Sequence, residues 1–155
     1  MLGWLRSWNK IIREVIWNDQ TLKQLMKIPA RTGVLPFTER YFIKSEYTSK
    51  LLTDEICRIV YSVGPGYSTD VPNVRQNIIV FDIYVKQEEM NNVGEDRLVT
   101  RADYIASRLF FLLTKDRYVA DTGYRFWPAP VRLDNGTRTT GYVRKTIGFY
   151  FMEVD

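Results

Sequence analysis

Few side chains in this sequence of 155 residues could perform acid–base, nucleophilic or metal chemistry, because it contains no histidine and a single cysteine. Histidine is the commonest general base, the usual partner of a nucleophilic serine or cysteine, and the commonest metal ligand. Cys57 lies in an alternating apolar run, so we interpret it as a buried structural thiol. Without a second cysteine no internal disulfide can form, which is compatible with a reducing compartment.

Three further features could bind or catalyse, and each has a plainer structural explanation. Asp82 could act as a general base, but the alternation around it places it on the polar face of a strand, where we expect pairing with Arg58. The acidic residues at 88–96 match no EF-hand spacing and favour a solvated loop and helix N-terminus. The turn Gly64-Pro65-Gly66 lacks the helix and Lys-Ser/Thr of a phosphate-binding loop. We therefore expect no enzyme, no cofactor and no metal site.

The spacing of apolar residues predicts helices at the beginning and in the middle of the chain. Between Leu2 and Ile16 apolar residues recur every three or four positions, which is the pattern of an amphipathic helix. Asp19 can cap a second short helix that ends before Pro29. A third helix, capped by Asp96 or Thr100, is predicted from an apolar face. That face consists of Leu98, Ala102, Ile105, Ala106, Leu109, Phe110 and Leu113.

Alternating apolar residues predict strands at 35–43, 55–63, 77–86, 118–120, 124–133 and 141–153. The second and third of these form a hairpin with a long Gly- and Pro-rich loop, and Asp134-Asn135-Gly136 predicts a turn before the last strand. The order of helix, strands, helix and strands predicts an α+β fold, with helices packed on one face of an antiparallel sheet. Because no linker divides the chain, we expect one domain over 1–155, with a helical segment at 1–28 and a sheet-plus-helix body at 35–155.

The formal net charge is +4, and part of the excess lies in the first helical segment. That segment carries Arg6, Lys10, Arg13, Lys23 and Lys27. Such a charge permits contact with DNA or with an acidic protein surface. The chain contains neither a run of about twenty apolar residues nor a signal-peptide pattern, so we expect a protein made and kept inside a cell, away from the membrane.

Aromatic residues stand beside basic ones in two places. Trp4 and Trp8 with their basic neighbours have the composition of a membrane-surface helix, but we favour docking on the chain's own sheet or on a neighbouring subunit. Basic and aromatic residues also interleave from Tyr124 to Trp127 and along the last strands, as in proteins that bind single-stranded nucleic acid. Strands with aromatic residues on one face and arginines on the other produce the same pattern, and we favour that explanation.

The chain resembles one known family in four of its elements: the N-terminal helix, the strand pair at 56–63 and 78–85, the helix at 99–109 and the aromatic last strand at 146–152. This family is that of the tail terminator, or tail completion, proteins of long-tailed bacteriophages, typified by the lambda tail terminator. The resemblance implies a structural virion protein of the tail or neck, assembled in the host cytoplasm as a homo-hexameric ring. Its implied partners are the tail tube protein, the head-tail connector or stopper protein, and DNA that passes through the lumen without sequence readout.

Polar loops on a rigid sheet are the expected places for neighbour contacts. The candidate interface residues are Trp4, Trp8, Tyr67, Asp70, Asn73, Glu88, Asn91, Asn135 and Arg138. The candidates for facing DNA are Arg125, Arg132, Arg144 and Lys145. Two alternatives stay open: another head-tail connector component, such as an adaptor or stopper, and a nucleic-acid-binding domain. The partner that co-purifies would identify the first, and affinity that falls steeply with salt would identify the second.

Overall fold

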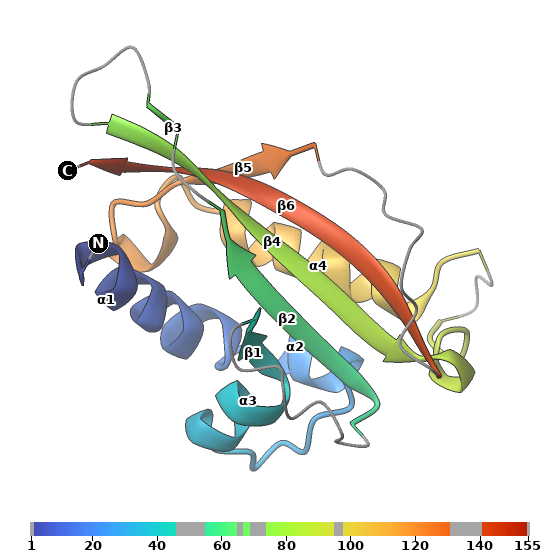
Figure 1. Cartoon of the computed structure of the whole chain (residues 1–155). Coiled ribbons are helices and arrows are strands. Elements are labelled where there is room, and N and C mark those ends of the chain that lie inside the picture. Colours follow the sequence, from blue (N-terminus) through green and yellow to red (C-terminus); the bar gives the residue numbers. More distant parts are fainter. Residues whose placement is uncertain are drawn as a thin grey trace.

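Helices cover one face of a twisted sheet in the computed structural model of the chain (Figure 1), which describes residues 2–45, 55–64, 67–68, 74–94, 98–130 and 141–154. The helices are α1 (Leu2–Ile11), α2 (Gln20–Leu25), α3 (Val34–Arg40) and α4 (Arg101–Thr114), with a π-helical turn η1 (Ile12–Ile16) after α1. Two short 3₁₀ turns, η3 (Gln87–Glu89) and η4 (Val119–Asp121), follow β4 and α4. The predicted α+β class is confirmed.

The strands are β1 (Phe42–Lys44), β2 (Cys57–Val63), β3 (Tyr67–Ser68), β4 (Val74–Lys86), β5 (Phe126–Ala129) and β6 (Tyr142–Val154). They form a sheet in the order β1-β2-β4-β6-β5, and β3 pairs with the beginning of β4. All pairs are antiparallel except β1 and β2, which run parallel. The predicted hairpin of the second and third strands is therefore confirmed as β2 and β4. The two longest strands, β4 and β6, lie side by side over their whole lengths.

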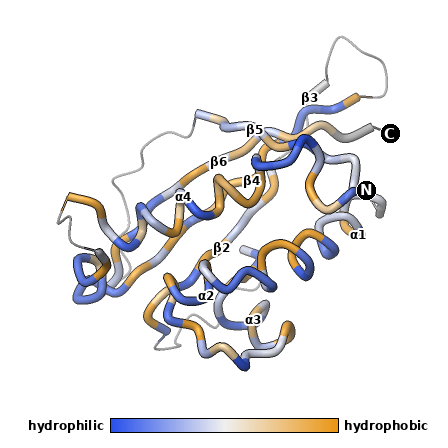
Figure 2. Tube along the Cα trace, turned by 180° about the vertical axis from the view of Figure 1, so that it is seen from behind, coloured by the Kyte–Doolittle hydropathy of each residue, from blue (hydrophilic) through white to orange (hydrophobic). Residues whose placement is uncertain are grey.

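The core lies between the helices and the inner face of the sheet. In Figure 2, seen from behind, hydrophilic and hydrophobic residues alternate along the helices, as expected for helices with one buried side. Trp4 is stacked on Phe151 of β6 with ring centroids 4.0 Å apart, and Trp8 packs edge-on against Tyr61 of β2 at 5.4 Å. Both tryptophans are only 4% exposed. The first helix is thus anchored across several strands by two large aromatic side chains.

The predicted helix starts are confirmed at two caps. The Asp19 side chain accepts a hydrogen bond from the Leu22 N–H at the beginning of α2. Thr100 and Asp103 form a reciprocal capping box at the beginning of α4. Leu98, predicted on the helix face, precedes this cap and is exposed. The alternative cap, Asp96, lies outside the described residues.

Two of the predicted strands are wrong. Residues 34–40 form helix α3, because Gly33 supplies an extended N-cap and Pro36 is tolerated in the first turn. Phe37 and Tyr41, four positions apart, then turn to the same buried side, and only Phe42–Lys44 is extended. The prediction at 118–120 fails because a 3₁₀ turn with Ala120 at φ 50° replaces the strand.

Strand β5 is shorter than the predicted strand 124–133. It ends at Ala129, directly before Pro130, and it carries a second proline at 128. Proline donates no backbone hydrogen bond, so it is found on edge strands, and β5 lies at one edge of this sheet. The rest of the prediction, 131–133, and the predicted turn at Asp134-Asn135-Gly136 lie outside the described residues.

Replacement of Trp4 by alanine should destabilise the protein by about 3–5 kcal/mol, because it removes a stacked aromatic ring from the core. The neighbouring Leu5 is 43% exposed, so Leu5→Ala is the matched control and should cost about 0.5 kcal/mol or less. Urea unfolding followed by tryptophan fluorescence and circular dichroism measures both changes. Equal effects of the two substitutions would contradict the anchoring role of Trp4.

Candidate interaction surfaces

Among the described residues, no group of three or more His, Cys, Asp or Glu side chains could hold a metal ion. Cys57 is fully buried in β2, and burial raises the pKa of its thiol to about 12, so the nucleophilic thiolate is scarce at neutral pH. Asp82 of β4 accepts a hydrogen bond of 2.6 Å from the Thr146 hydroxyl of β6. It lies opposite Val60 in the sheet, one row away from Arg58. The carboxylate of Asp82, which was the candidate general base, therefore joins two neighbouring strands through this hydrogen bond.

The outer face of the sheet is the most extensive candidate surface. The helices all pack on the other face (Figure 1). Val60 of β2 points to the outer face, and although it is buried it does not belong to the hydrophobic core between sheet and helices. Strand register arranges this outer face in cross-strand rows. The rows are Arg58, Tyr84 and Arg144; Val60, Asp82 and Thr146; Ser62, Val80, Gly148 and Ala129; and Ile78, Tyr150 and Trp127. We call these residues the open face.

The open face changes character along the strands. At one end the guanidinium of Arg58 lies over the ring of Tyr142, 5.6 Å from its centroid. The Tyr142 hydroxyl donates a hydrogen bond to the Glu55 carbonyl. At the other end Trp127 and Tyr150 form a cross-strand aromatic pair with centroids 6.3 Å apart. The outer face therefore carries arginine and tyrosine side chains at one end, where Arg58 is only 4% exposed, and aromatic and aliphatic side chains at the other. Between the two ends lie smaller side chains and Asp82.

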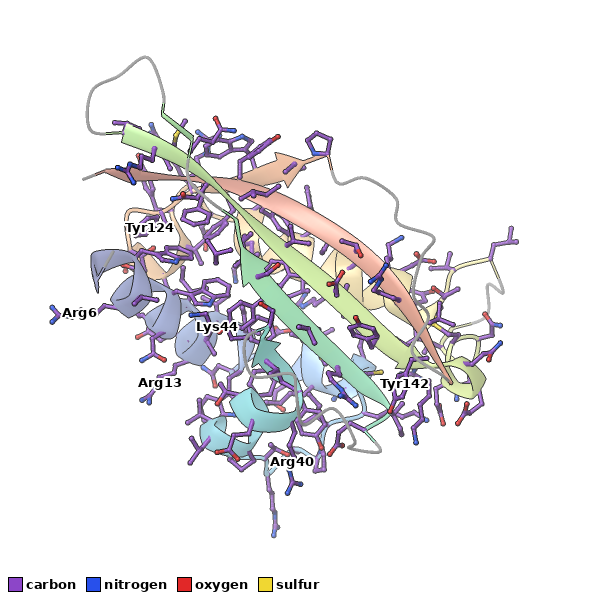
Figure 3. The ribbon with its side chains drawn as sticks, in the orientation of Figure 1. Arg6, Arg13, Arg40, Lys44, Tyr124 and Tyr142 are labelled. Carbon is purple, nitrogen blue, oxygen red and sulfur yellow. The ribbon has the colours of Figure 1, made fainter. Side chains whose placement is uncertain are left out.

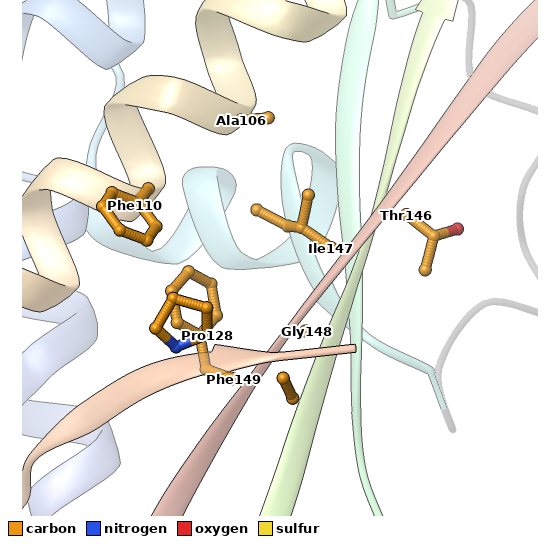
Figure 4. A pocket seen from close by; sticks show the side chains of 8 residues that line it. Ala106, Phe110, Pro128, Thr146, Ile147, Gly148 and Phe149 are labelled. Carbon is orange, nitrogen blue, oxygen red and sulfur yellow. The ribbon is translucent and has the colours of Figure 1, made fainter. Parts of the chain in front are cut away.

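A cavity of about 220 Å³ lies at the sheet edge between α4, β5 and β6 (Figure 4). Its lining consists of Ala106, Phe110, Pro128, Ala129, Thr146, Ile147, Gly148 and Phe149. None of these side chains is titratable, so the cavity offers shape and apolar contact but no acid, base or charge. Phe110 was predicted on the buried face of its helix, yet it is 46% exposed at this cavity.

Two arginines of α4 hold the helical layer together, and sequence reasoning missed both. Arg101 is 4% exposed and donates hydrogen bonds to the Leu25 carbonyl, the Glu89 carbonyl and the Asn92 side chain. It thereby joins the end of α2 to the loop before α4. The sequence contains a signal for this role, because an arginine directly after a capping threonine lies in the first turn of the helix. A cation there interacts unfavourably with the helix dipole, so its presence indicates a compensating contact elsewhere in the fold.

Arg108 forms a bidentate ion pair with Asp19, through contacts of 2.9 Å to Oδ2 and 2.6 Å to Oδ1. Burial alone would raise the pKa of Asp19, but hydrogen bonds from Arg108 and the Leu22 N–H, with the charge of Arg108, hold that pKa below its usual value. One carboxylate therefore caps α2 and fastens it to α4.

The structure disperses the predicted interface residues. Trp4 and Trp8 are part of the chain's own core, which accounts for their size and position without a partner. Glu88 in η3 and Asn91 just after it are exposed near the Arg101 network. Tyr67 lies in β3, which pairs with β4. The others, Asp70, Asn73, Asn135 and Arg138, lie outside the described residues.

The residues predicted to face DNA do not form one surface. Arg144 and Lys145 are consecutive in β6, so their side chains point to opposite faces of the sheet. Arg144 belongs to the open face, whereas Lys145 Nζ binds Asp103 of α4 at 2.8 Å. Arg125 is exposed just before β5, and Arg132 lies outside the described residues. The alternation of a strand separates groups that look adjacent in the sequence.

Searches with this chain found no matching family model, no matching curated protein and no matching solved structure. Across the described part of the chain, no helix has both the length and the apolar character that a membrane crossing needs.

The buried thiol predicts that Cys57 does not react in the native protein. With a pKa of about 12 and no exposed surface, it should remain unmodified by Ellman's reagent at pH 7.5 and react stoichiometrically after unfolding in guanidinium chloride. A rapid reaction of the folded protein would show that the β2 edge of the core opens.

The Asp19–Arg108 pair predicts a pH-dependent contribution to stability. Because the folded pKa of Asp19 is lowered, the contribution is fully present above the unfolded pKa of about 4 and disappears as the pH falls through the folded value. Asp19→Asn retains a capping side chain but loses the charge, and should cost about 2 kcal/mol at pH 7.

The difference in unfolding free energy between wild type and Asp19→Asn should narrow between pH 5 and pH 2.5 in urea titrations. Asp116→Asn, at an exposed position in the loop after α4, is the control and should change little at any pH. A constant difference across this range would show that the charge of Asp19 does not carry the effect.

Proposed function

We propose that this chain is a structural subunit of a phage neck or tail end, which assembles into a ring that caps the tail tube and joins it to the head connector. The observation that carries the proposal is the open face. An antiparallel sheet with one solvated face normally alternates apolar and polar residues. Here β4 places Ile78 and Val80 on the outer face, and β5 and β6 add Trp127 and Tyr150. Apolar residues gathered on one outer face are typical of protein contact surfaces.

Ring assembly is supported by the difference between the two sides of the subunit. Helices lie on one side of the sheet and leave the other side uncovered by helices (Figure 1). The helices carry charged residues on their outer surfaces, and the other face of the sheet carries aromatic and aliphatic residues. Contact between two unlike surfaces is heterologous, and repeated heterologous contacts close into a ring when the rotation permits. The sequence resemblance to tail terminators favours six subunits, a location in the virion and assembly in the host cytoplasm.

The chemistry of the described residues supports binding in preference to catalysis. The thiol is buried, Asp82 is bonded to Thr146, and the apolar cavity has no titratable group in its lining. A cavity of that size at the sheet edge suits an apolar side chain from a neighbouring subunit or from the tail tube protein.

Val80→Arg should prevent assembly without unfolding the subunit, because it places a charge in the middle of the open face, where the side chain points away from the core. Light scattering should give wild-type protein a mass about six times the 18.3 kDa of one chain, and Val80→Arg the mass of one chain. Leu35→Arg is the matched control, because Leu35 is apolar and 66% exposed on α3, and it should assemble like wild type.

A second outcome supports the same proposal: wild-type protein that is monomeric alone but assembles when purified tail tube protein is added, whereas Val80→Arg does not. A wild-type monomer indifferent to tube protein would refute the terminator function. Assembly of Val80→Arg equal to that of wild type would show that the open face is not the contact surface.

A further inference from the structure

The positive charge of this chain is concentrated in its first 45 residues. They contain eight lysines and arginines against three acidic residues, whereas the remaining residues contain fourteen against fifteen. The net charge of +4 therefore comes entirely from the segment that folds into α1, η1, α2, α3 and β1. Charge concentrated in one segment produces a local field stronger than the modest total suggests.

The buried tryptophans determine where this charge points. With 3.6 residues per turn, Arg6 and Lys10 lie about 40° apart on α1, roughly opposite Trp4 and Trp8. Arg13 follows in the π-helical turn η1 and is exposed, whereas Ile12 and Ile16 of that turn are buried. Because the tryptophans pack against the sheet, the three cations face solvent along a stripe about 10 Å long. Figure 3 shows Arg6 and Arg13 directed outward from the helix.

Arg40 at the end of α3 extends the same side of the molecule and is also directed outward (Figure 3). We call Arg6, Lys10, Arg13 and Arg40 the N-terminal basic surface. All four are exposed.

These cations are not used to hold the fold together. Arg101, Arg108 and Lys145 are each bonded to backbone or carboxylate groups in the interior or between elements. By contrast, Arg6, Arg13 and Arg40 make no ion pair or side-chain hydrogen bond with any residue in the described ranges. Lys10 has only an exposed helical pair with Glu14 at 3.9 Å, a contact of small energetic value.

We propose that the N-terminal basic surface binds the phosphate backbone of double-stranded DNA without reading its sequence. The row of Arg6, Lys10 and Arg13 along one helical segment suits a linear polyanion. Three of the four cations of the surface are arginines, whose planar fork binds phosphate oxygens in pairs. In the part of the chain that the structure describes, no aromatic ring is exposed between them for base stacking, so we assign the contact to the backbone. The inference rests on the proposed function, and it takes DNA as partner from the resemblance to tail terminators that supports that function. It moves the expected DNA contact from Arg125, Arg132, Arg144 and Lys145 to the N-terminal basic surface.

The test is binding of a fluorescently labelled 30-base-pair duplex, measured by anisotropy between 25 and 200 mM NaCl. Wild-type affinity should fall with salt, and two duplexes of unrelated sequence should bind equally. The triple variant Arg6→Gln, Arg13→Gln, Arg40→Gln should bind about tenfold or more weakly at 50 mM salt, with a log–log salt slope smaller by about 2–3.

The matched control is Lys115→Gln, Arg117→Gln, Arg125→Gln. It removes the same charge from exposed positions after α4 and before β5, including one residue that the sequence analysis assigned to DNA. This control should retain affinity within about threefold of wild type and nearly the full salt slope. An equal loss of DNA affinity in both triple variants would show that only the net charge matters, and it would overturn the proposal.

Wild-type protein that binds labelled polyglutamate but not duplex DNA would also overturn it, in favour of an acidic protein partner. Melting curves of all variants check folding, and light scattering on the same samples reports assembly. A protein that assembles but does not bind DNA refutes this inference alone, and a protein that binds DNA as a monomer refutes only the ring function.

Discussion

The packing of Trp4 and Trp8 under the sheet is the contact on which the other features depend. Trp4 lies on Phe151 of β6 and Trp8 contacts Tyr61 of β2, so one short helix spans strands that are far apart in the sequence. A helix of this length is marginal in isolation and acquires its stability from the face it buries. Fixing that face also fixes the opposite one, which presents Arg6 and Lys10 to solvent.

Polar contacts specify how the remaining helices join this layer. Asp19 caps α2 and binds Arg108 of α4. Arg101 donates hydrogen bonds to the carbonyl groups of Leu25, at the end of α2, and of Glu89, before α4. Charged groups in such positions are favourable only when they are well hydrogen-bonded, since each would otherwise carry a desolvation cost. The result is a helical layer in which Arg101 and Arg108 are bonded within the fold, whereas Arg6, Arg13 and Arg40 have no ion-pair partner in the described ranges.

One side of the sheet is thereby closed by helices, and the other presents the open face. A subunit with two chemically different surfaces suits an assembly in which each copy contacts a different part of its neighbour. The proposed ring and the proposed DNA contact use separate surfaces, the sheet face and the N-terminal basic surface. An assembly protein can therefore keep its subunit contacts apolar while it retains a salt-sensitive contact with a passing polyanion.

The sequence alone determined the elements whose periodicity is strong: the first helix, α4 with its Thr100 cap, and strands β2, β4 and β6. These follow from local spacing, because one side of each element must be buried. The strand predictions failed at 118–120 and over most of 35–43, where a few apolar residues fit a helix, a turn or a strand equally well and long-range packing decides. Only the tertiary structure could show that Lys145 binds Asp103, that Arg101 is buried and Arg108 is paired with Asp19, and that Arg6, Lys10 and Arg13 remain exposed. Whether a cation is paired depends on which groups the fold brings within a few ångströms of it. That distance in space cannot be read from the separation of two residues along the chain.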